Sequence, residues 1–397
     1  MRAIMVMLVM LVSVTAGAQE MASWVLWSKS ESTLYFVRDN VAHQKKEDYN
    51  GNIVSTWRIP DKADSQGVKT TNKASWSSAK KDCTKVVFED SFSAARPIYC
   101  IDWFNGFKKL TSIEGIKNLK TDEVTSMKQM FKDCSALNSN SLDLSGFITS
   151  KVTDMSGMFW GCSALTTLDL GNFDTSQVTD MKNMFFKCSA LTELDVSNFN
   201  ATSVTDISSM FVGCGTLKTL NMSGFEATNL KKMKNLFKGC DGLRKIDMSG
   251  FNTGNVSSLA SFFSDKKRPL TTIDLSGMKA SNVKNMSKML YNCPFLKTVN
   301  LSKLDAPVLT NMSGMFAVDG KKIISSLETV DLSGIIVHGS KTLAINSMFE
   351  NCSALTSLNL SGFDAPMVSS MKMMFKNCSA LTTLDLKDLY NINSATL

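Results

Sequence analysis

Acidic residues recur at a nearly constant spacing along this chain of 397 residues. Each lies in a short apolar run such as Leu168-Asp169-Leu170, where residues two apart share one face of a strand and Asp169 lies on the other face. In a stack of strands about 4.8 Å apart, carboxylates in one column repel by about 0.9 kcal/mol per pair in water, so asparagines in the column would relieve repulsion. The column is Asp143, Asp169, Asp195, Asn221, Asp247, Asp274, Asn300, Asp331, Asn359 and Asp385.

Two interpretations of this column are open. It is either a solvated ladder, satisfied by threonine hydroxyls and backbone amides, or an acidic surface that binds a basic segment of a partner or a cation. Insertions at 317–324 and 336–343 flank one strand, and irregular loops of this kind often carry binding residues. The predicted binding residues are Asp247, Thr272, Asp274, Thr329, Asp331, His338 and Lys341.

The sequence contains few of the residues and motifs that enzymes use for catalysis. The chain has two histidines, His43 and His338, and neither belongs to an H-E-x-x-H motif. No G-x-S-x-G motif occurs, and G-S-K-T at 339–342 lacks the glycine that precedes the lysine of a phosphate-binding loop. No C-x-x-C pair indicates a metal site. We therefore expect no enzymatic activity, no cofactor and no bound metal.

Eight of the ten cysteines occupy one position of a repeat. Cysteines of secreted proteins are usually paired, but a shared repeat position predicts a buried column of free thiols. The other two, Cys83 and Cys100, allow a disulfide that the sequence alone does not decide. The column consists of Cys134, Cys162, Cys188, Cys214, Cys240, Cys293, Cys352 and Cys378.

The repeat itself has a period of about 26 residues, marked by a Met-Phe pair, with a longer interval of 33 residues between Phe316 and Phe349. Such a period is the signature of a leucine-rich solenoid, whose coils fold only with their neighbours. From Val178 to Cys188 the apolar residues recur every three or four positions, as on a short helix. We therefore predict an α/β solenoid in which each coil holds one strand and one helix, with a parallel sheet on one face.

The N-terminal part does not follow the repeat. Residues 1–18 combine Arg2, an apolar run and Ala-Gly-Ala, which is typical of a signal peptide cleaved after Ala18. The sequence predicts four parts: a signal peptide (1–18), a β-rich cap (19–82), the solenoid (83–390) and a short tail (391–397).

The predicted cap holds four of the six tryptophans, near strand-like runs at 23–27, 33–38 and 53–59. Burial against the first coil is the favoured use of these rings, although tryptophan can also form a carbohydrate platform. The four are Trp24, Trp27, Trp57 and Trp76.

The chain is mildly basic, with a formal net charge of +7. Its lysines lie mostly outside the apolar stripe without arginine or aromatic residues between them, which predicts a solvated face rather than a nucleic-acid site. No segment is long and apolar enough for a transmembrane helix. We also expect the last strand, Thr383–Leu386, to leave an unpaired edge that permits self-association.

The pattern MFxxCSALTxLDLSxFxxxxVTDMxxMF is almost complete at 158–185 and at 348–375. It resembles the BspA-like leucine-rich repeat family of bacterial surface proteins, over about 83–389. The resemblance implies an extracellular or surface-associated binding protein, and several members of that family are adhesins for host matrix and plasma proteins.

Together these features predict a non-enzymatic secreted or cell-surface binding protein, an adhesin that recognises host or neighbouring-cell proteins through the sheet face. The alternative is a carbohydrate-binding or carbohydrate-active secreted factor that uses Trp24, Trp27 and Trp57 with the acidic column. Turnover of a glycan, or its retention without hydrolysis, would distinguish the alternative. A resemblance in fold does not identify the ligand.

Overall fold

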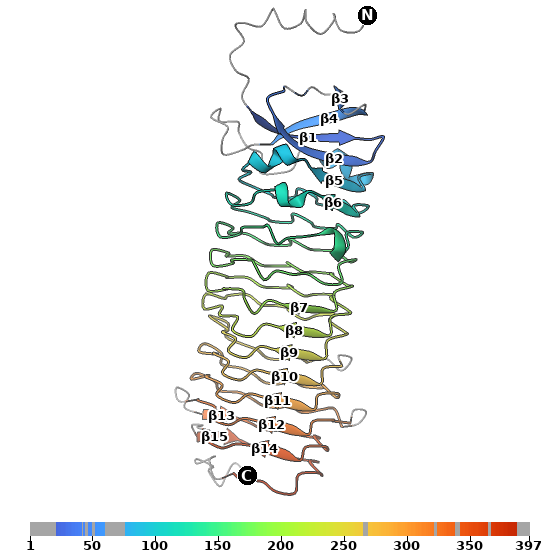
Figure 1. The fold of residues 1–397 in the computed structure, drawn as a ribbon. Coiled ribbons are helices and arrows are strands. Elements are labelled where there is room, and N and C mark those ends of the chain that lie inside the picture. The colour runs from blue at the N-terminus through green and yellow to red at the C-terminus, as the bar shows by residue number, and fades with distance from the viewer. Residues whose placement is uncertain are drawn as a thin grey trace, which may run out of the picture.

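The computed structural model describes residues 21–41, 43, 47–49, 52–59, 76–264, 269–320, 324–337, 342–363 and 367–386. In this part of the chain the backbone winds into a long stack of coils, with short strands aligned down one side (Figure 1). The predicted signal peptide, the predicted tail, His338 and Lys341 lie outside the described residues.

Seven parallel strands form the sheet of the stack. The register is constant, so that Asp195 lies beside Asn221 and Asp274 lies beside Asn300. The middle residue of each strand points into the core, which confirms the predicted solenoid with a parallel sheet on one face. The strands are β7 (Glu193–Asp195), β8 (Thr219–Asn221), β9 (Lys245–Asp247), β10 (Thr272–Asp274), β11 (Thr298–Asn300), β12 (Thr329–Asp331) and β14 (Ser357–Asn359).

The helix predicted for each coil is wrong. The described residues contain no α-helix, and 178–188 is a series of turns. Met184 N–H donates within the coil to the Met181 carbonyl at 3.2 Å, whereas Phe185 N–H donates to the Met210 carbonyl of the next coil at 2.9 Å. Three-residue turns bring apolar side chains inward at the same spacing as a helix, so the sequence pattern fits both. The short 3-10 segments are η1 (Ser77–Lys81), η2 (Asp90–Ala94), η3 (Ile116–Asn118) and η4 (Ser139–Ser141).

Residues in the left-handed conformation allow these turns. Asn183 and Lys187 have φ values of 57° and 58°. The position of Lys187 is taken by Gly161 and Gly213 in the neighbouring coils, with φ values of 74° and 75°. Glycine and asparagine adopt this conformation at the least cost, which explains why they recur at the turns.

A column of phenylalanine rings fills the middle of the stack. The rings of Phe159, Phe185 and Phe211 are fully buried, and successive centroids lie 5.8 and 5.7 Å apart with the planes within 3° of parallel. Leu290 interrupts this column, which resumes with Phe316. Each coil completes the core of its neighbour, as expected for a solenoid.

A six-stranded sheet lies at the N-terminal end of the described chain (Figure 1). Strand β2 (Thr33–Asp39) pairs antiparallel with β1 (Ala22–Ser28) but parallel with β5 (Lys85–Phe88), so the sheet continues into the coils. The three strand-like runs of the sequence correspond to β1, β2 and β4. The strands are β1 (Ala22–Ser28), β2 (Thr33–Asp39), β3 (Glu47–Tyr49), β4 (Asn52–Ile59), β5 (Lys85–Phe88) and β6 (Ser112–Glu114).

The tryptophans of this region face the interior to different degrees. Trp27 and Trp76 are buried, and Trp76 Nε1 donates to the Trp103 carbonyl at 2.8 Å. Trp24 and Trp57 are half-buried against separate apolar clusters. Packing into the core is therefore the main use of these rings.

Three predicted strands are absent from the described residues, at 142–144, 165–170 and 383–386. At 165–170, the N–H groups of Thr166 and Thr167 donate to Ser139 Oγ at 3.0 and 2.9 Å, so they are not free for a strand ladder. The edge strand expected at Thr383–Leu386 is not formed. A further parallel pair, β13 (Thr342–Ala344) with β15 (Met367–Ser370), lies on the other side of the coils from β12 and β14 (Figure 1).

Candidate binding surface

The outward side chains of the sheet form two rows. In β8 the middle residue, Leu220, is 2% exposed, and its neighbours Thr219 and Asn221 point outward. The first row is mostly threonine, and the second is the predicted column of aspartate and asparagine. The constant register therefore holds the predicted binding residues of the sheet in line.

Each member of the column from Asp143 to Asn359 holds the turn that follows it. Asp274 Oδ1, for example, accepts the backbone N–H of Ser276 at 2.9 Å. This is an Asx turn, which aspartate and asparagine both form. The two residues interchange along the column because the turn needs the side-chain oxygen and not its charge.

Two asparagines of the column also bond to a neighbouring carboxylate. The Asn221 amide donates to Asp195 Oδ2, and the Asn359 amide donates to Asp331 Oδ1, both at 3.1 Å. Burial acts to raise the pKa of Asp195, but hydrogen bonds from Ser197 and Asn221 outweigh it and lower the pKa below the ordinary value. Asp195 is therefore charged at neutral pH.

Two hollows lie on the sheet face. One, of about 390 Å³, spans β10 to β14 and brings together Thr272, Asp274, Thr329 and Asp331. Asp247 lines a separate hollow of about 550 Å³ across β7 to β9. The structure thus unites four of the seven predicted residues, while His338 and Lys341 lie outside the described part.

A second acidic row was missed by the sequence analysis. Asp154, Asp180 and Asp206 form parallel bridges with one another on the side of the coils away from the sheet. Burial raises the pKa of Asp180, and the charges of Asp154 and Asp206 add to the rise. The recurring V-T-D-M motif was the available signal, but it had been assigned to a helix surface.

The cysteine column is buried as predicted from Cys134 to Cys352, and its thiols are free; Cys378 is half-buried. Each thiol donates to the carbonyl of a phenylalanine in the preceding coil, as Cys188 does to Phe159 at 3.0 Å. Burial raises the pKa of Cys188 well above its ordinary value. Cys83 and Cys100 are also buried free thiols, so no bridge joins them in this structure.

In the described part of the chain, His, Cys, Asp and Glu side chains form no group of three or more that is arranged to hold a metal ion. The same residues include no helix with the length and apolar character needed to cross a bilayer.

The coils, the constant register and the polar sheet face define a repeat solenoid. The chain belongs to the family described as "Mycoplasma protein of unknown function, DUF285", whose model matches 100–185, 138–245, 216–329 and 337–396. A search of curated proteins gave no match.

Solved structures of bacterial leucine-rich repeat proteins are similar to this chain. A protein from Bacteroides ovatus is 16% identical over 92% of this chain and 81% of its own, with a TM-score of 0.45. One from Eubacterium ventriosum is 16% identical over 92% and 89%, with a TM-score of 0.32. The functional domain of InlJ from Listeria monocytogenes, which includes a cysteine ladder, is 16% identical over 75% and 57%, with a TM-score of 0.26. No functional conclusion follows from likenesses at this level.

Proposed function

We propose that this protein is a non-enzymatic binding protein, secreted or held at the cell surface, that recognises a partner protein through the polar face of its sheet. The hollow across β10 to β14 carries the proposal. Asp274 and Asp331 each use one oxygen to hold a turn, and the other oxygen has no partner among the described residues. Two carboxylates held in fixed positions suit two basic side chains of a partner.

The resemblance to the BspA-like family supports an adhesin, so host matrix and plasma proteins are the first ligands to test. The double variant Asp274→Asn/Asp331→Asn keeps both turns, because asparagine holds the same turn at Asn300. It removes only the two charges. We expect binding to weaken about tenfold, as for two exposed ion pairs, and to fall with added salt in the unmodified protein.

The matched control is Asp143→Asn/Asp169→Asn, which makes the same charge change in the same column outside this hollow. It should leave the affinity unchanged. Equal affinity of the two double variants for a ligand that the unmodified protein binds would place recognition elsewhere on the molecule.

Secretion is part of the proposal and rests on the sequence of residues 1–18. Protein recovered from the medium or the cell surface should begin at Gln19. An intact Met1 in that fraction would contradict cleavage.

The carbohydrate alternative relied on Trp24, Trp27 and Trp57. Trp27 is buried and the other two are half-buried, so these rings form no open platform. A glycan array probed with the full chain, together with an assay for hydrolysis, tests this alternative directly.

A further inference from the structure

A second line of backbone hydrogen bonds joins the coils on the side away from the sheet, here called the bridge side. The N–H groups of Ile207 and Ser209 donate to the carbonyls of Lys232 and Lys234 in the next coil, both at 2.9 Å. Equivalent bonds join every pair of neighbouring coils in the described chain, from the coil of Cys100 to that of Ile345, with one exception.

The exception is the junction between the coils that contain Met233 and Ser258. Parallel bridges end at Lys232 and resume at Ser258. By the 25-residue spacing of the bonds from Ile207 and Ser209, the N–H groups of Met233 and Asn235 would donate to the carbonyls of Ser258 and Ala260, but none of these four groups has a hydrogen-bond partner among the described residues. One wall of the junction thus presents unpaired donors and the other presents unpaired acceptors.

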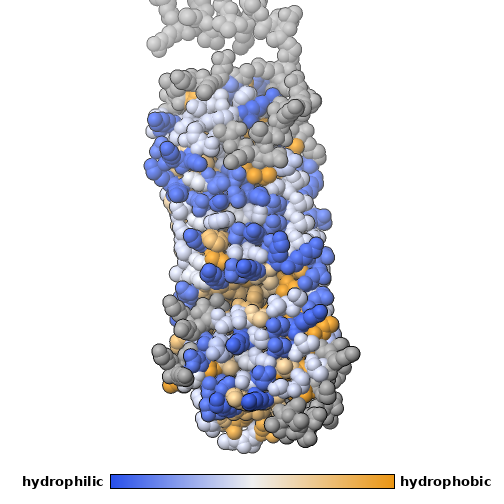
Figure 2. Space-filling model, turned by 180° about the vertical axis from the view of Figure 1, so that it is seen from behind, coloured by the Kyte–Doolittle hydropathy of each residue, from blue (hydrophilic) through white to orange (hydrophobic). Residues whose placement is uncertain are grey.

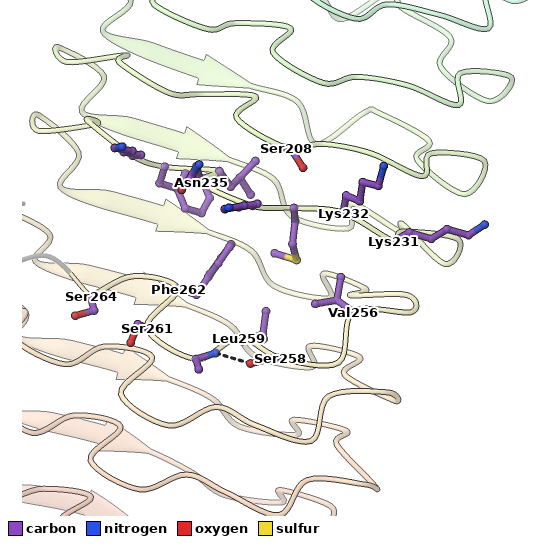
Figure 3. A pocket seen from close by; sticks show the side chains of 16 residues that line it. Ser208, Lys231, Lys232, Asn235, Val256, Ser258, Leu259, Ser261, Phe262 and Ser264 are labelled. Carbon is purple, nitrogen blue, oxygen red and sulfur yellow. Dashed lines mark hydrogen bonds between the residues drawn. The ribbon is translucent and has the colours of Figure 1, made fainter.

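The open junction encloses a hollow of about 680 Å³ (Figure 3). Lys231, Lys232, Lys234 and Lys238 lie around it with several serines, and the described residues of its lining include no acidic side chain. None of these four lysines forms an ion pair within the described chain. The described lining of the hollow is therefore positively charged.

Two residues beside the opening depart from the regular coil. At Gly254 the coils approach so closely that a Cβ atom would lie 2.5 Å from the Ala227 carbonyl oxygen. Phe262 occupies the position that Met210 fills in a regular coil; Met210 is fully buried, whereas the larger Phe262 is half-exposed and packs edge-on against Phe237 at 5.6 Å. A close backbone approach at Gly254 and a larger side chain at Phe262 thus occur beside the junction where the backbone bonds are missing.

The floor of the hollow is apolar. Met233, Val256 and Leu259 line it beside Phe262. On the face turned away from the viewer of Figure 1, hydrophilic residues predominate and apolar residues reach the surface in the middle of the stack (Figure 2). The site thus combines lysines, two backbone edges without hydrogen-bond partners among the described residues, and a small apolar floor.

We propose that this junction binds an extended acidic peptide segment of a partner protein as an inserted strand. The peptide carbonyls accept from Met233 and Asn235, and the peptide N–H groups donate to Ser258 and Ala260, which completes the ladder that the other junctions close directly. Alternate acidic side chains meet the lysines, and alternate apolar side chains lie over Phe262. The charge is opposite to that of the sheet face, so the two surfaces select different segments.

Fluorescence anisotropy with the full chain and a labelled peptide that alternates Glu and Val tests the proposal. We expect Lys231→Gln/Lys234→Gln to weaken binding about tenfold. The control, Lys284→Gln/Lys182→Gln, makes the same changes at the same repeat positions outside the hollow and should leave the affinity unchanged. Equal losses of affinity in the two double variants would mean that the peptide responds to the overall charge of the protein and not to this hollow.

Two further measurements separate an inserted strand from a general anion site. A peptide N-methylated at alternate residues keeps its charge but loses backbone donors, so it should not bind. Phe262→Met should let the junction close, abolish binding and slow hydrogen exchange at Met233 and Asn235. The proposal would be overturned if the methylated peptide, or a sulfated oligosaccharide of the same charge, bound as tightly as the unmodified peptide. It would also be overturned if the Glu-Val peptide did not bind.

Discussion

At the scale of single residues, the cysteine column joins packing to hydrogen bonding. The Cys188 thiol is fully buried and donates to the Phe159 carbonyl at 3.0 Å, while Lys187 beside it is exposed. Cys188→Ser places a more polar group in an apolar site and should destabilise the stack by about 1 kcal/mol, more than Lys187→Ser. Urea denaturation midpoints measure the difference. Equal midpoints would count against the assigned packing of the column.

The thiols also predict how stability depends on pH. Their pKa values are raised by burial, that of Cys352 to about 12, so the folded protein keeps protons that the unfolded chain releases near pH 9. Below about pH 9 the thiols are protonated in both states, and their contribution to the free energy of unfolding is fully present. As the pH rises from there toward the pKa of the folded state, that contribution is lost by up to about 1.4 kcal/mol per pH unit for each thiol. Cys188→Ala should make this decline less steep, as measured by urea denaturation at pH 8 to 10. An unchanged slope would show that Cys188 is already ionised in the folded protein.

The left-handed turn position before each cysteine gives a further prediction. Lys187 has φ 58°, which strains a residue with a side chain and strains a β-branched one most. Lys187→Gly should raise the free energy of unfolding by about 1 kcal/mol, and Lys187→Val should lower it by a similar amount. The reverse order in thermal denaturation would mean that the turn has another conformation.

At the scale of the elements, the two-residue spacing of apolar side chains predicted the register of the sheet from β7 to β14, although its example at Leu168 and Leu170 forms no strand. It did so because strand periodicity is two residues and few other structures share it. The helix could not be excluded in the same way, since a three-residue spacing also suits tight turns bonded to the next coil. The role of Asp274 in an Asx turn was visible only once the position of Ser276 was known.

That turn is testable at Asp274. Asp274→Asn retains the oxygen that accepts the Ser276 N–H, whereas Asp274→Ala leaves this donor without its partner. We expect the alanine variant to lose about 1 kcal/mol of stability and the asparagine variant to lose little. Similar losses would indicate that the charge, and not the turn, stabilises this part of the sheet.

At the scale of the whole molecule, the sequence predicted a continuous stack but did not reveal its weak junction. Every coil carries similar apolar positions, so periodicity alone treats all junctions as equal. The sequence predicts a solvated face for the lysines of the coils, Lys234 and Lys238 among them, and it assigns no role to Phe262. Only the pattern of backbone bonds shows that these residues gather where two coils separate.

In a solenoid, stability is approximately the sum of terms for each coil and terms for each junction, so a junction that lacks bonds on one side should open first. On the sheet side, Met248 N–H donates to the Asp274 carbonyl between β9 and β10, which border the weak junction, and Leu275 N–H donates to the Asn300 carbonyl across a regular one, both at 2.8 Å. Because the two bonds have the same length and setting, only the junctions differ. We expect Met248 N–H to exchange with solvent faster than Leu275 N–H under native conditions, and Phe262→Met to bring the two rates together. Equal rates in the unmodified protein would mean that the paired strands β9 and β10 hold the junction as firmly as a complete one.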